Sequence, residues 1–511
     1  MSSTTSPTQV DHLIVGAGFA GLAAAIKLDE AGERDLVVIE KDSDVGGTWH
    51  INTYPGAECD VPSQLYSYSF ALNPDWSKVY SPQPEILEYI RKVARDSGTL
   101  DRFVFNTAVL DSTWDAATQR WNVRTEGPDG PRVYAARTVV SCAGGLSEPR
   151  VPEIEGIDSF AGEIFHSARW NHDVDLTGKR IAVIGTGASA IQLVPELQEI
   201  AGHVDVYQRT PNWVIPRNER KFTSLEKTAF RKVPGLQRAA RSAVYSTLEG
   251  RVPAFAKFPD LLKVVEAQGK KNIHGAIKDP ELRAKVTPNY RAGCKRILIS
   301  NKWYPALAAD NVDLVTDPIV KITANGVVTA DGTERPIDVL VVATGFYVTE
   351  PPIAEHVTGK DGRTLADLWN EQGMAAYKGT TIHGFPNLFQ IVGPNTALGH
   401  SSIIFIIESQ VKYVVEAAKA MRREGIGAFE PTLSAQDEWT ADIRQKMKPT
   451  VWQTGGCASW YQDKFGNNTT LWPGQTFTFR QHLTKFDLDK YDVEPVSAPV
   501  KKTRAKKKVS K

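Results

Sequence analysis

The chain has 511 residues, 41% of them hydrophobic and 23% charged, which allows two or three domains and is typical of a soluble globular protein. The net charge of +1 conceals a basic end, because residues 501–511 carry seven Lys or Arg and leave 53 basic against 59 acidic residues elsewhere. The four cysteines form no closely spaced pair, so the sequence supports neither a disulfide framework nor a metal site. No run of about 18 apolar residues occurs, so secretion and membrane spanning also lack support. We therefore expect a cytoplasmic protein in a reducing compartment.

Residues 11–40 have the pattern of a strand, a glycine-rich turn, an alanine-rich helix and a second strand. The turn holds Gly16, Gly18 and Gly21 in GxGxxG spacing, which lets the backbone approach a pyrophosphate at the amino end of the helix. Glu40 ends the second strand, 19 residues after Gly21. A carboxylate there accepts hydrogen bonds from a ribose 2′-hydroxyl and repels a 2′-phosphate, so this unit predicts a site for FAD or NAD.

The same pattern returns at residues 179–209, where the position equivalent to Glu40 is Arg209. Arg can pair with a phosphate through two hydrogen bonds, which indicates NADPH at this unit and leaves FAD to the first. The alternative for Arg209 is an ordinary exposed surface arginine. The residues predicted to bind the second nucleotide are Gly185, Thr186, Gly187, Ser189, Arg209 and Thr210.

Between the two units, Phe160, Gly162, His166 and Trp170 fit the pattern FxGxxxHxxxW. This segment resembles the fingerprint of the type I Baeyer–Villiger monooxygenases, except that Asn171 stands where the family usually has Pro or Asp. Related flavin-containing N- and S-oxygenases carry Tyr or Phe in place of the tryptophan, so the resemblance favours the ketone-oxidising branch.

Two further segments carry the resemblance, which extends from about residue 10 to residue 490. One is GGTWHINTYPGAECD, which matches a family pattern through Gly47, Trp49, Tyr54, Pro55, Gly56 and Asp60. The other is GCKR at residues 293–296, which is similar to the family segment whose Lys and Arg face NADPH and flavin.

The resemblance implies a role for each matching residue. Arg296 is expected to be the active-site cation, Asp60 the carboxylate that positions it, and Lys295 with Arg209 the clamp on the 2′-phosphate. His166 and Trp170 are expected to couple NADP movement to catalysis without touching the transferred oxygen. Without the resemblance, these side chains would be interpreted as structural or solvated. Gly47, Thr48, Trp49 and Asp60 join the predicted cofactor-binding set.

The implied activity is NADPH- and FAD-dependent insertion of one oxygen atom of dioxygen next to a ketone carbonyl, through a C4a-peroxyflavin, to give an ester or lactone. The cofactor carries the reactive chemistry, and the protein positions it and tunes the local charge. Arg296 suits this task because a fixed cation stabilises developing negative charge, and a guanidinium cannot give up its proton there.

The sequence predicts an α/β protein with two Rossmann-like dinucleotide-binding domains and a helical insertion. The apolar strand 338–346 ends in Ala343, Thr344 and Gly345, a small-residue crossing between the nucleotide domains. The expected boundaries are 1–150 and 375–500 for FAD, 151–217 and 291–374 for NADP, 218–290 for the insertion, and 501–511 for a disordered basic tail.

Two late segments bear on the active site. Residues 457–479, which include Trp460, Tyr461 and Trp472, resemble the family's mobile loop over the active site, although an aromatic-capped surface loop would have the same composition. Residues 399–410 have the pattern of an apolar helix near the flavin. The pocket side chains suggest a small apolar ketone, and open-chain, cyclic and aryl ketones all stay possible.

Three other functions compete with this interpretation. A flavin-dependent N- or S-monooxygenase shares both nucleotide folds, a disulfide reductase would need a cysteine pair that the sequence lacks, and a non-catalytic flavin-binding protein would not need Arg209. The basic tail suits nucleic acid or anionic lipid, but without aromatic neighbours a solvated end is favoured, so no nucleic-acid or membrane partner is expected.

Overall fold

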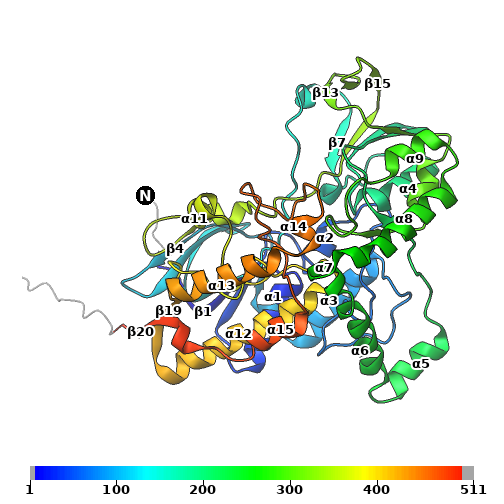
Figure 1. Cartoon of the computed structure of the whole chain (residues 1–511). Helices are drawn as coiled ribbons and strands as arrows, with labels where there is room; N and C mark the ends of the chain where they lie inside the picture. Colours follow the sequence, from blue (N-terminus) through cyan, green and yellow to red (C-terminus); the bar gives the residue numbers. More distant parts are fainter. Residues whose placement is uncertain (1–5, 498–511) are drawn as a thin grey trace, which may run out of the picture.

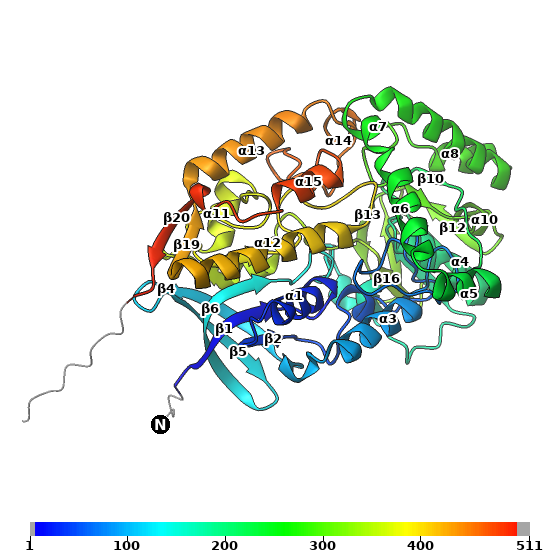
Figure 2. The same ribbon diagram turned by 90° about the horizontal axis from the view of Figure 1, so that it is seen from below.

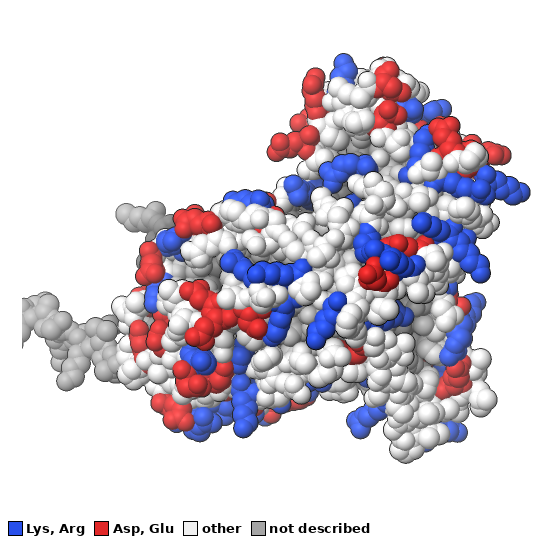
Figure 3. All heavy atoms as spheres, viewed as in Figure 1, with Lys and Arg blue, Asp and Glu red and all other residues white. Residues whose placement is uncertain are grey.

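The structure is a computed structural model that describes residues 6–497, so the basic tail predicted at 501–511 lies outside the described residues. Its described elements form two lobes, each built on a β-sheet, and α2 (Thr48–Ile51), α7 (Val252–Ala256) and α14 (Val451–Thr454) lie where the lobes meet (Figure 1). Acidic and basic side chains are interspersed on the face shown in Figure 3.

The first lobe contains an eight-stranded sheet in the order β17-β4-β5-β6-β1-β2-β3, with β18 also paired to β6. Its centre, β6-β1-β2-β3, is parallel, and β4, β5 and β6 form an antiparallel meander that was not predicted from the sequence. The strands are β1 (Thr8–Val15), β2 (Leu36–Ile39), β3 (Phe103–Val104), β4 (Ala108–Asp115), β5 (Arg120–Gly127), β6 (Gly130–Ser141), β17 (Val357–Thr358) and β18 (Leu388–Gln390).

Helices cover both faces of this sheet, so β1 is apolar on both sides: Leu13 packs into one core and Ile14 into the other. On one face, α1 (Phe19–Glu30) and α12 (Ile403–Glu424) lie side by side, as Figure 2 shows, and α3 (Gln83–Ser97) joins the same core. On the other face, α11 (Leu365–Gln372) packs through Leu365 and Trp369. The remaining elements of this lobe are α13 (Leu433–Met447), α15 (Thr476–His482), β19 (Ile426–Pro431) and β20 (Tyr491–Pro495).

The second lobe contains a parallel five-stranded sheet in the order β12-β9-β8-β16-β7. Alternating apolar residues of β8 face α4 on one side and the β13-β14-β15 meander on the other. The elements are β7 (Glu163–His166), β8 (Arg180–Ile184), α4 (Ala190–Ile200), β9 (His203–Tyr207), α10 (Trp303–Leu307), β12 (Val312–Val315), β13 (Ile319–Ile322), β14 (Gly326–Thr329), β15 (Glu334–Pro336) and β16 (Val339–Val342).

Helices also occupy most of the stretch 218–290, for which helices were predicted. They are α5 (Ser224–Lys232), α6 (Leu236–Glu249), α7, a 3-10 turn at Pro259–Leu262, α8 (Lys263–Ala276) and α9 (Pro280–Val286). The short strands β10 (Val214–Ile215) and β11 (Leu298–Ile299) pair in parallel at the base of this stretch.

The chain crosses between the lobes twice, and the two crossings run side by side. Pro149 and Phe346 form an antiparallel bridge, and the Arg150 amide donates a hydrogen bond to the Gly345 carbonyl over 2.9 Å. After the second crossing, β17 and α11 already pack on the first sheet, so the return lies nearer residue 345 than the expected residue 375. None of the helices in residues 6–497 has the length and apolar content needed to cross a bilayer.

Candidate active site

The glycine turn of the first lobe is held by close backbone contacts that only glycine permits. Gly16 has a φ of +99°, and a Cβ on it would lie 2.6 Å from the Cys142 carbonyl oxygen. A Cβ on Gly21 would lie 1.8 Å from the Gly16 carbonyl oxygen, so α1 starts directly against the turn. Among the described residues, no side chain caps the start of α1, which leaves its first amide groups available to an anion. This geometry fits the pyrophosphate of a dinucleotide.

The second predicted motif packs against this turn. Gly47 has a φ of +52°, and a Cβ on it would lie 2.9 Å from the Gly18 Cα atom. The Gly46 amide donates a hydrogen bond to the Ala17 carbonyl over 3.0 Å. Thr48 and Trp49 follow Gly47 at the start of α2, so the structure places this part of the predicted cofactor-binding set next to the turn at Gly18.

Glu40 lies buried at the end of β2, beside the same turn. Its Oε2 accepts a hydrogen bond from the Ala17 amide over 2.6 Å, and its Oε1 accepts one from the Asp42 amide over 2.9 Å. Burial raises the pKa of the Glu40 carboxyl, while these two amides lower it. Each carboxylate oxygen has a further lone pair, so the predicted role as ribose acceptor is compatible with these contacts.

The glycine turn of the second lobe is tight at one position and open at another. Gly185 has a φ of +117°, and a Cβ on it would lie 2.4 Å from the Ala343 carbonyl oxygen. Gly187 is exposed, and a Cβ on it would have no described atom within 4 Å beyond its own chain neighbours. Ser189 precedes α4 without a side-chain cap from the described residues. The open space at Gly187 leaves room for a dinucleotide to approach the backbone.

Two cations lie next to this turn. Arg209 is exposed two residues after the end of β9, and Lys295 is half-buried over the Tyr290 ring, with its Nζ 5.2 Å from the ring centroid. Burial lowers the pKa of Lys295, and the positive charge of Arg209 lowers it further. Neighbouring like charges repel each other, so the pair favours binding of an anion such as a 2′-phosphate.

Replacing Arg209 with alanine should therefore raise the KM for NADPH by roughly tenfold or more and leave the KM for NADH nearly unchanged, because only NADPH carries the 2′-phosphate. Steady-state kinetics with both coenzymes measures this. Equal losses with NADPH and NADH would mean that Arg209 does not bind the phosphate.

Arg296 and Asp60 form a two-pronged ion pair between the lobes. Arg296 Nε donates to Asp60 Oδ2 over 2.8 Å, and Arg296 Nη2 donates to Asp60 Oδ1 over 2.8 Å. The charge of Asp60 raises the pKa of Arg296 above its usual value, despite the opposing effect of burial. The two side chains keep 30% and 27% of their surface exposed, so the pair fixes the guanidinium without enclosing it.

The segment that holds Asp60 docks on α4 of the second lobe, through contacts that were not predicted from the sequence. A Cβ on Gly56 would lie 2.7 Å from the Gln192 carbonyl oxygen. The Tyr54 hydroxyl donates to Gln192 Oε1 over 2.9 Å, and Gln192 Nε2 donates to the Glu58 carbonyl over 3.0 Å. Arg217 adds an ion pair with Glu58. Gln192 lies on the helix of the second dinucleotide unit but at none of its signature positions, and Arg217 lies outside the predicted motifs, so no local signal marked either residue.

The FxGxxxHxxxW segment forms β7 and the turn after it, at the edge of the second sheet. A Cβ on Gly162 would lie 2.3 Å from the Asp338 carbonyl oxygen, and Trp170 packs edge-on against Phe165. His166 ends β7 beside Val342, and its Nδ1 accepts a hydrogen bond from the Ala168 amide over 3.1 Å. His166 therefore lies beside the crossing between the lobes.

Burial lowers the pKa of His166 from its usual 6.5 to about 4, while a backbone interaction with Gly345 acts in the opposite direction. Between these two values the unfolded chain binds the proton and the folded chain does not. The free energy of unfolding should therefore fall as the pH drops from 6.5 toward 4, by on the order of 2 to 3 kcal/mol.

The His166→Asn variant tests this pH dependence, because its amide oxygen can still accept from Ala168 while the titrating group is gone. Urea unfolding of both proteins near pH 7 and near pH 5 should show a smaller loss in the variant. Equal losses would mean that His166 does not resist protonation in the folded protein.

The expectation that the cysteines form no disulfide is wrong, because Cys294 and Cys457 are bonded. They lie 163 residues apart in sequence, so only folding brings them together. Cys457 opens the predicted loop, in which Tyr461 is 1% and Trp472 is 3% exposed, whereas Trp460 keeps 46% of its surface exposed. Tyr461 and Trp472 therefore pack the loop against the protein interior, whereas Trp460 faces solvent.

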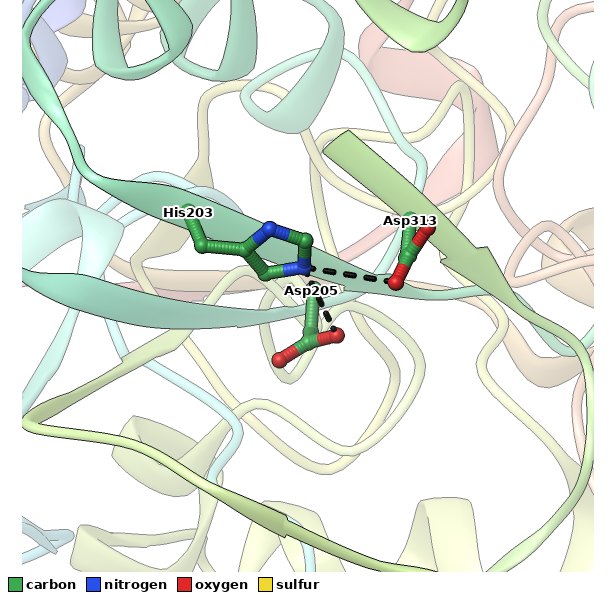
Figure 4. A group of neighbouring side chains, drawn as sticks. All are labelled: His203, Asp205 and Asp313. Atoms are coloured by element: carbon green, nitrogen blue, oxygen red, sulfur yellow. Dashed lines mark ion pairs between the residues drawn. The ribbon is translucent and has the colours of Figure 1, made fainter. Parts of the chain in front are cut away.

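A further charged cluster, formed by His203, Asp205 and Asp313, lies in β9 and β12 of the second sheet (Figure 4). His203 Nε2 lies 3.5 Å from Asp205 Oδ1 and 3.3 Å from Asp313 Oδ2, so a protonated His203 pairs with both carboxylates. This spacing could also hold a metal, although none was expected from the sequence. His203 begins β9, whereas the glycine turn follows the opposite end of β8, so we assign the cluster no part in the candidate active site.

Two dinucleotide folds that share one interface, with a fixed guanidinium between them, define a flavoprotein that takes electrons from a nicotinamide coenzyme. The comparisons agree with this class. Residues 10–222 match the family model described as flavin-binding monooxygenase-like. A Baeyer–Villiger monooxygenase of Pseudomonas aeruginosa is 45% identical over 495 residues, which cover 96% of this chain and 93% of the relative.

Solved structures match over nearly the whole chain as well. OTEMO in complex with FAD and NADP has a TM-score of 0.85 at 28% identity, covering 96% of this chain and 100% of the other. Cyclohexanone monooxygenase from Rhodococcus sp. Phi1 bound to NADP+ has a TM-score of 0.84 at 29% identity, covering 96% and 100%. The chain therefore belongs to the type I Baeyer–Villiger monooxygenases, the family of FAD- and NADP-dependent enzymes that its motifs resemble. This membership confirms the predicted fold class and favours the ketone-oxidising branch over N- or S-oxygenation.

Proposed function

We propose that this chain uses NADPH and dioxygen to convert a small apolar ketone into an ester or lactone. The observation that carries the proposal is the two-pronged pair between Asp60 and Arg296, because it fixes a guanidinium between the two nucleotide turns. Such a preorganised cation stabilises negative charge as it develops on oxygen, with no reorganisation at the moment of reaction.

The residues of each turn suit one of the two cofactors. Gly16, Gly18, Gly21 and Glu40 would hold FAD, because the carboxylate suits a ribose with free hydroxyl groups. The open turn at Gly187, with its neighbouring cations, would hold NADPH. When bound, NADPH supplies the hydride and FAD activates dioxygen for transfer to the ketone. We also propose the domain boundaries expected from the sequence, with the second crossing moved to about residue 345.

Within this arrangement the protein orients the reactants and excludes water. Asp60 accepts from two nitrogens of Arg296, which sets the plane of the guanidinium and leaves its remaining N–H groups for the substrate side. Aromatic and aliphatic side chains near the Arg296 segment form an apolar wall that suits a ketone with little polar surface. Its buried members include Trp213, Phe255, Tyr290, Trp452 and Tyr461.

The ketone itself is a finer part of the proposal. Cyclohexanone monooxygenase is named for a cyclic ketone, whereas the compact length of this chain favours open-chain aliphatic ketones by resemblance. A cytoplasmic location completes the proposal, because the cytoplasm supplies NADPH and the face shown in Figure 3 mixes acidic and basic side chains.

Product analysis with open-chain, cyclic and aryl ketones, alongside a thioether, tests this function. NADPH should bleach the flavin absorbance without oxygen, and in air each accepted ketone should give one ester or lactone per NADPH consumed. If NADPH bleaches the flavin but only sulfoxide forms, the ketone role fails. If NADPH does not bleach the flavin at all, the assignment of the two nucleotide sites fails as well.

A further inference from the structure

The disulfide between Cys294 and Cys457 joins two segments on which the proposed active site depends. Cys294 directly precedes Lys295 and Arg296. Cys457 begins the stretch 457–475, which lies between α14 and α15 and in which the described residues form neither helix nor strand. We refer to residues 457–475 as the aromatic loop. The bond therefore fixes the start of the aromatic loop to the segment that carries the guanidinium.

The two ends of the aromatic loop are held differently. At its far end, Trp472 donates a backbone hydrogen bond to Ala397 over 2.9 Å, and Ala397 donates to Thr470 over 3.0 Å. At its near end, the Arg291 amide donates to the Gly455 carbonyl over 3.0 Å, just before the loop starts. The disulfide is thus the covalent tie at the near end. Without it, residues 458–468 would be held by side-chain packing and by a few hydrogen bonds, among them Asn395 Nδ2 to the Asn468 carbonyl over 2.8 Å and Gln453 Nε2 to the Gly466 carbonyl over 3.3 Å.

Those residues include Tyr461, which is 1% exposed and packs in the same apolar cluster as Cys294 and Trp452. The Tyr461 hydroxyl and the Arg296 guanidinium lie close enough for each to influence the pKa of the other. Burial raises the pKa of Tyr461 to about 12, so its hydroxyl keeps its proton. Release of the near end of the loop would therefore uncover a residue that lies beside the catalytic cation.

We propose that Cys294 and Cys457 are a site of reversible oxidative modification: the disulfide fixes the aromatic loop beside Arg296, and the dithiol form releases it. Cys457 is only half-buried, so small oxidants and reductants can reach it, whereas Cys294 is 1% exposed and reacts only through its contact with Cys457. Cys59 and Cys142 are buried, and burial raises the pKa of both thiols, which makes them unreactive. In a reducing compartment a disulfide is usually transient and responsive to redox state.

Disulfide formation requires a two-electron oxidant, and the oxidant that we propose is hydrogen peroxide. One thiol attacks an oxygen of the peroxide, which forms a sulfenic acid and releases water. The second thiol attacks that sulfur, which forms the S–S bond and releases a second water. Overall, the two thiols lose two electrons and two protons, and one molecule of hydrogen peroxide gains them. The source of the hydrogen peroxide is the enzyme itself, a step that rests on the proposed function. NADPH oxidation that fails to transfer oxygen to a ketone yields hydrogen peroxide. A thiol such as glutathione reverses the bond by exchange.

The test uses the FAD-loaded protein and added hydrogen peroxide. After reduction with dithiothreitol and removal of the reductant, stoichiometric peroxide should bond Cys294 to Cys457, which mass spectrometry detects as the loss of two alkylatable thiols. The rate of cleavage by trypsin then measures how readily the aromatic loop opens, because Lys464 is exposed within it. Cleavage after Lys464 should be faster in the dithiol form by about tenfold or more, since cleavage follows local opening.

Cysteine variants distinguish the effect of the Cys294–Cys457 disulfide on cleavage from other effects of peroxide and reductant. Cys294→Ser and Cys457→Ser should each be cleaved rapidly with or without peroxide, whereas Cys142→Ala, the matched control, should respond to peroxide as the wild type does. Equal cleavage of the dithiol and disulfide forms would overturn the proposal, as would a bond that glutathione fails to reduce or thiols that peroxide oxidises without joining. The comparison of the two wild-type forms needs no variant.

These readouts do not depend on the proposed function. If NADPH fails to bleach the flavin, the function fails, while bond formation with added peroxide still tests the switch. If ketone oxygenation occurs but the loop is cleaved alike in both forms, only the switch fails.

Discussion

Replacing Arg296 with alanine should reduce the yield of oxygenated product per NADPH consumed by on the order of hundreds-fold, while FAD binding persists. The reason is electrostatic: loss of one preorganised charge donor typically costs about 3 to 4 kcal/mol of transition-state stabilisation. In the wild type, Asp60 accepts hydrogen bonds from two nitrogens of Arg296. Without this partner, the Asp60 carboxylate would add an unpaired negative charge near the oxygen on which negative charge must develop. NADPH should still reduce the flavin, and hydrogen peroxide should replace the ester as product.

Two further variants sharpen this prediction. Arg296→Lys should restore little, because one ammonium group cannot donate to both Asp60 oxygens in the observed geometry. Arg291→Ala is the matched control, since Arg291 lies in the same segment but pairs with Asp260 and Glu266. Product, NADPH and hydrogen peroxide are measured together. Normal coupling in Arg296→Ala, or equal uncoupling in Arg291→Ala, would exclude the proposed role of Arg296.

The parts of the fold that could be predicted from sequence are those whose signal is local. Gly16, Gly21 and Gly185 mark backbone contacts closer than any side chain allows, and the strands before them are apolar on both faces. Glu40 and Arg209 stand at the same offset from their turns, which distinguishes the two units by sequence alone. The antiparallel meander of β4 to β6 was missed, because its pairing depends on neighbours rather than on a motif.

The parts that could not be derived locally join residues far apart in the chain. Arg296 and Asp60 are 236 residues apart, and the resemblance alone suggested that they meet. The disulfide was predicted to be absent, because the spacing of cysteines in sequence says nothing of contacts across 163 residues. Gln192 lies on an ordinary helix face, and only the structure shows that it binds the segment before Asp60. The functional assignments of the individual site residues stay predictions.

Replacing Gly21 with alanine should largely abolish FAD binding. The added methyl group would lie 1.8 Å from the Gly16 carbonyl oxygen, so α1 must move away from the turn or the turn must open. Overpacking of this kind typically costs about 1 to 3 kcal/mol, and more where backbone rather than a flexible side chain must yield. The shift would also move the first amide groups of α1, which the proposed pyrophosphate site requires to point at the anion.

The ratio of flavin to protein absorbance in purified samples measures this loss. Gly275→Ala is the matched control: no described atom lies within 4 Å of the added methyl, and Gly275 lies in α8, where alanine favours the helix by about 1 kcal/mol. That variant should keep its FAD and its thermal midpoint. Gly187→Ala distinguishes the two turns, because the polypeptide leaves room for its methyl and only a bound coenzyme would meet it. It should therefore keep FAD and bind NADPH more weakly, whereas full FAD occupancy in Gly21→Ala would show that the turn of the first lobe is not the flavin site.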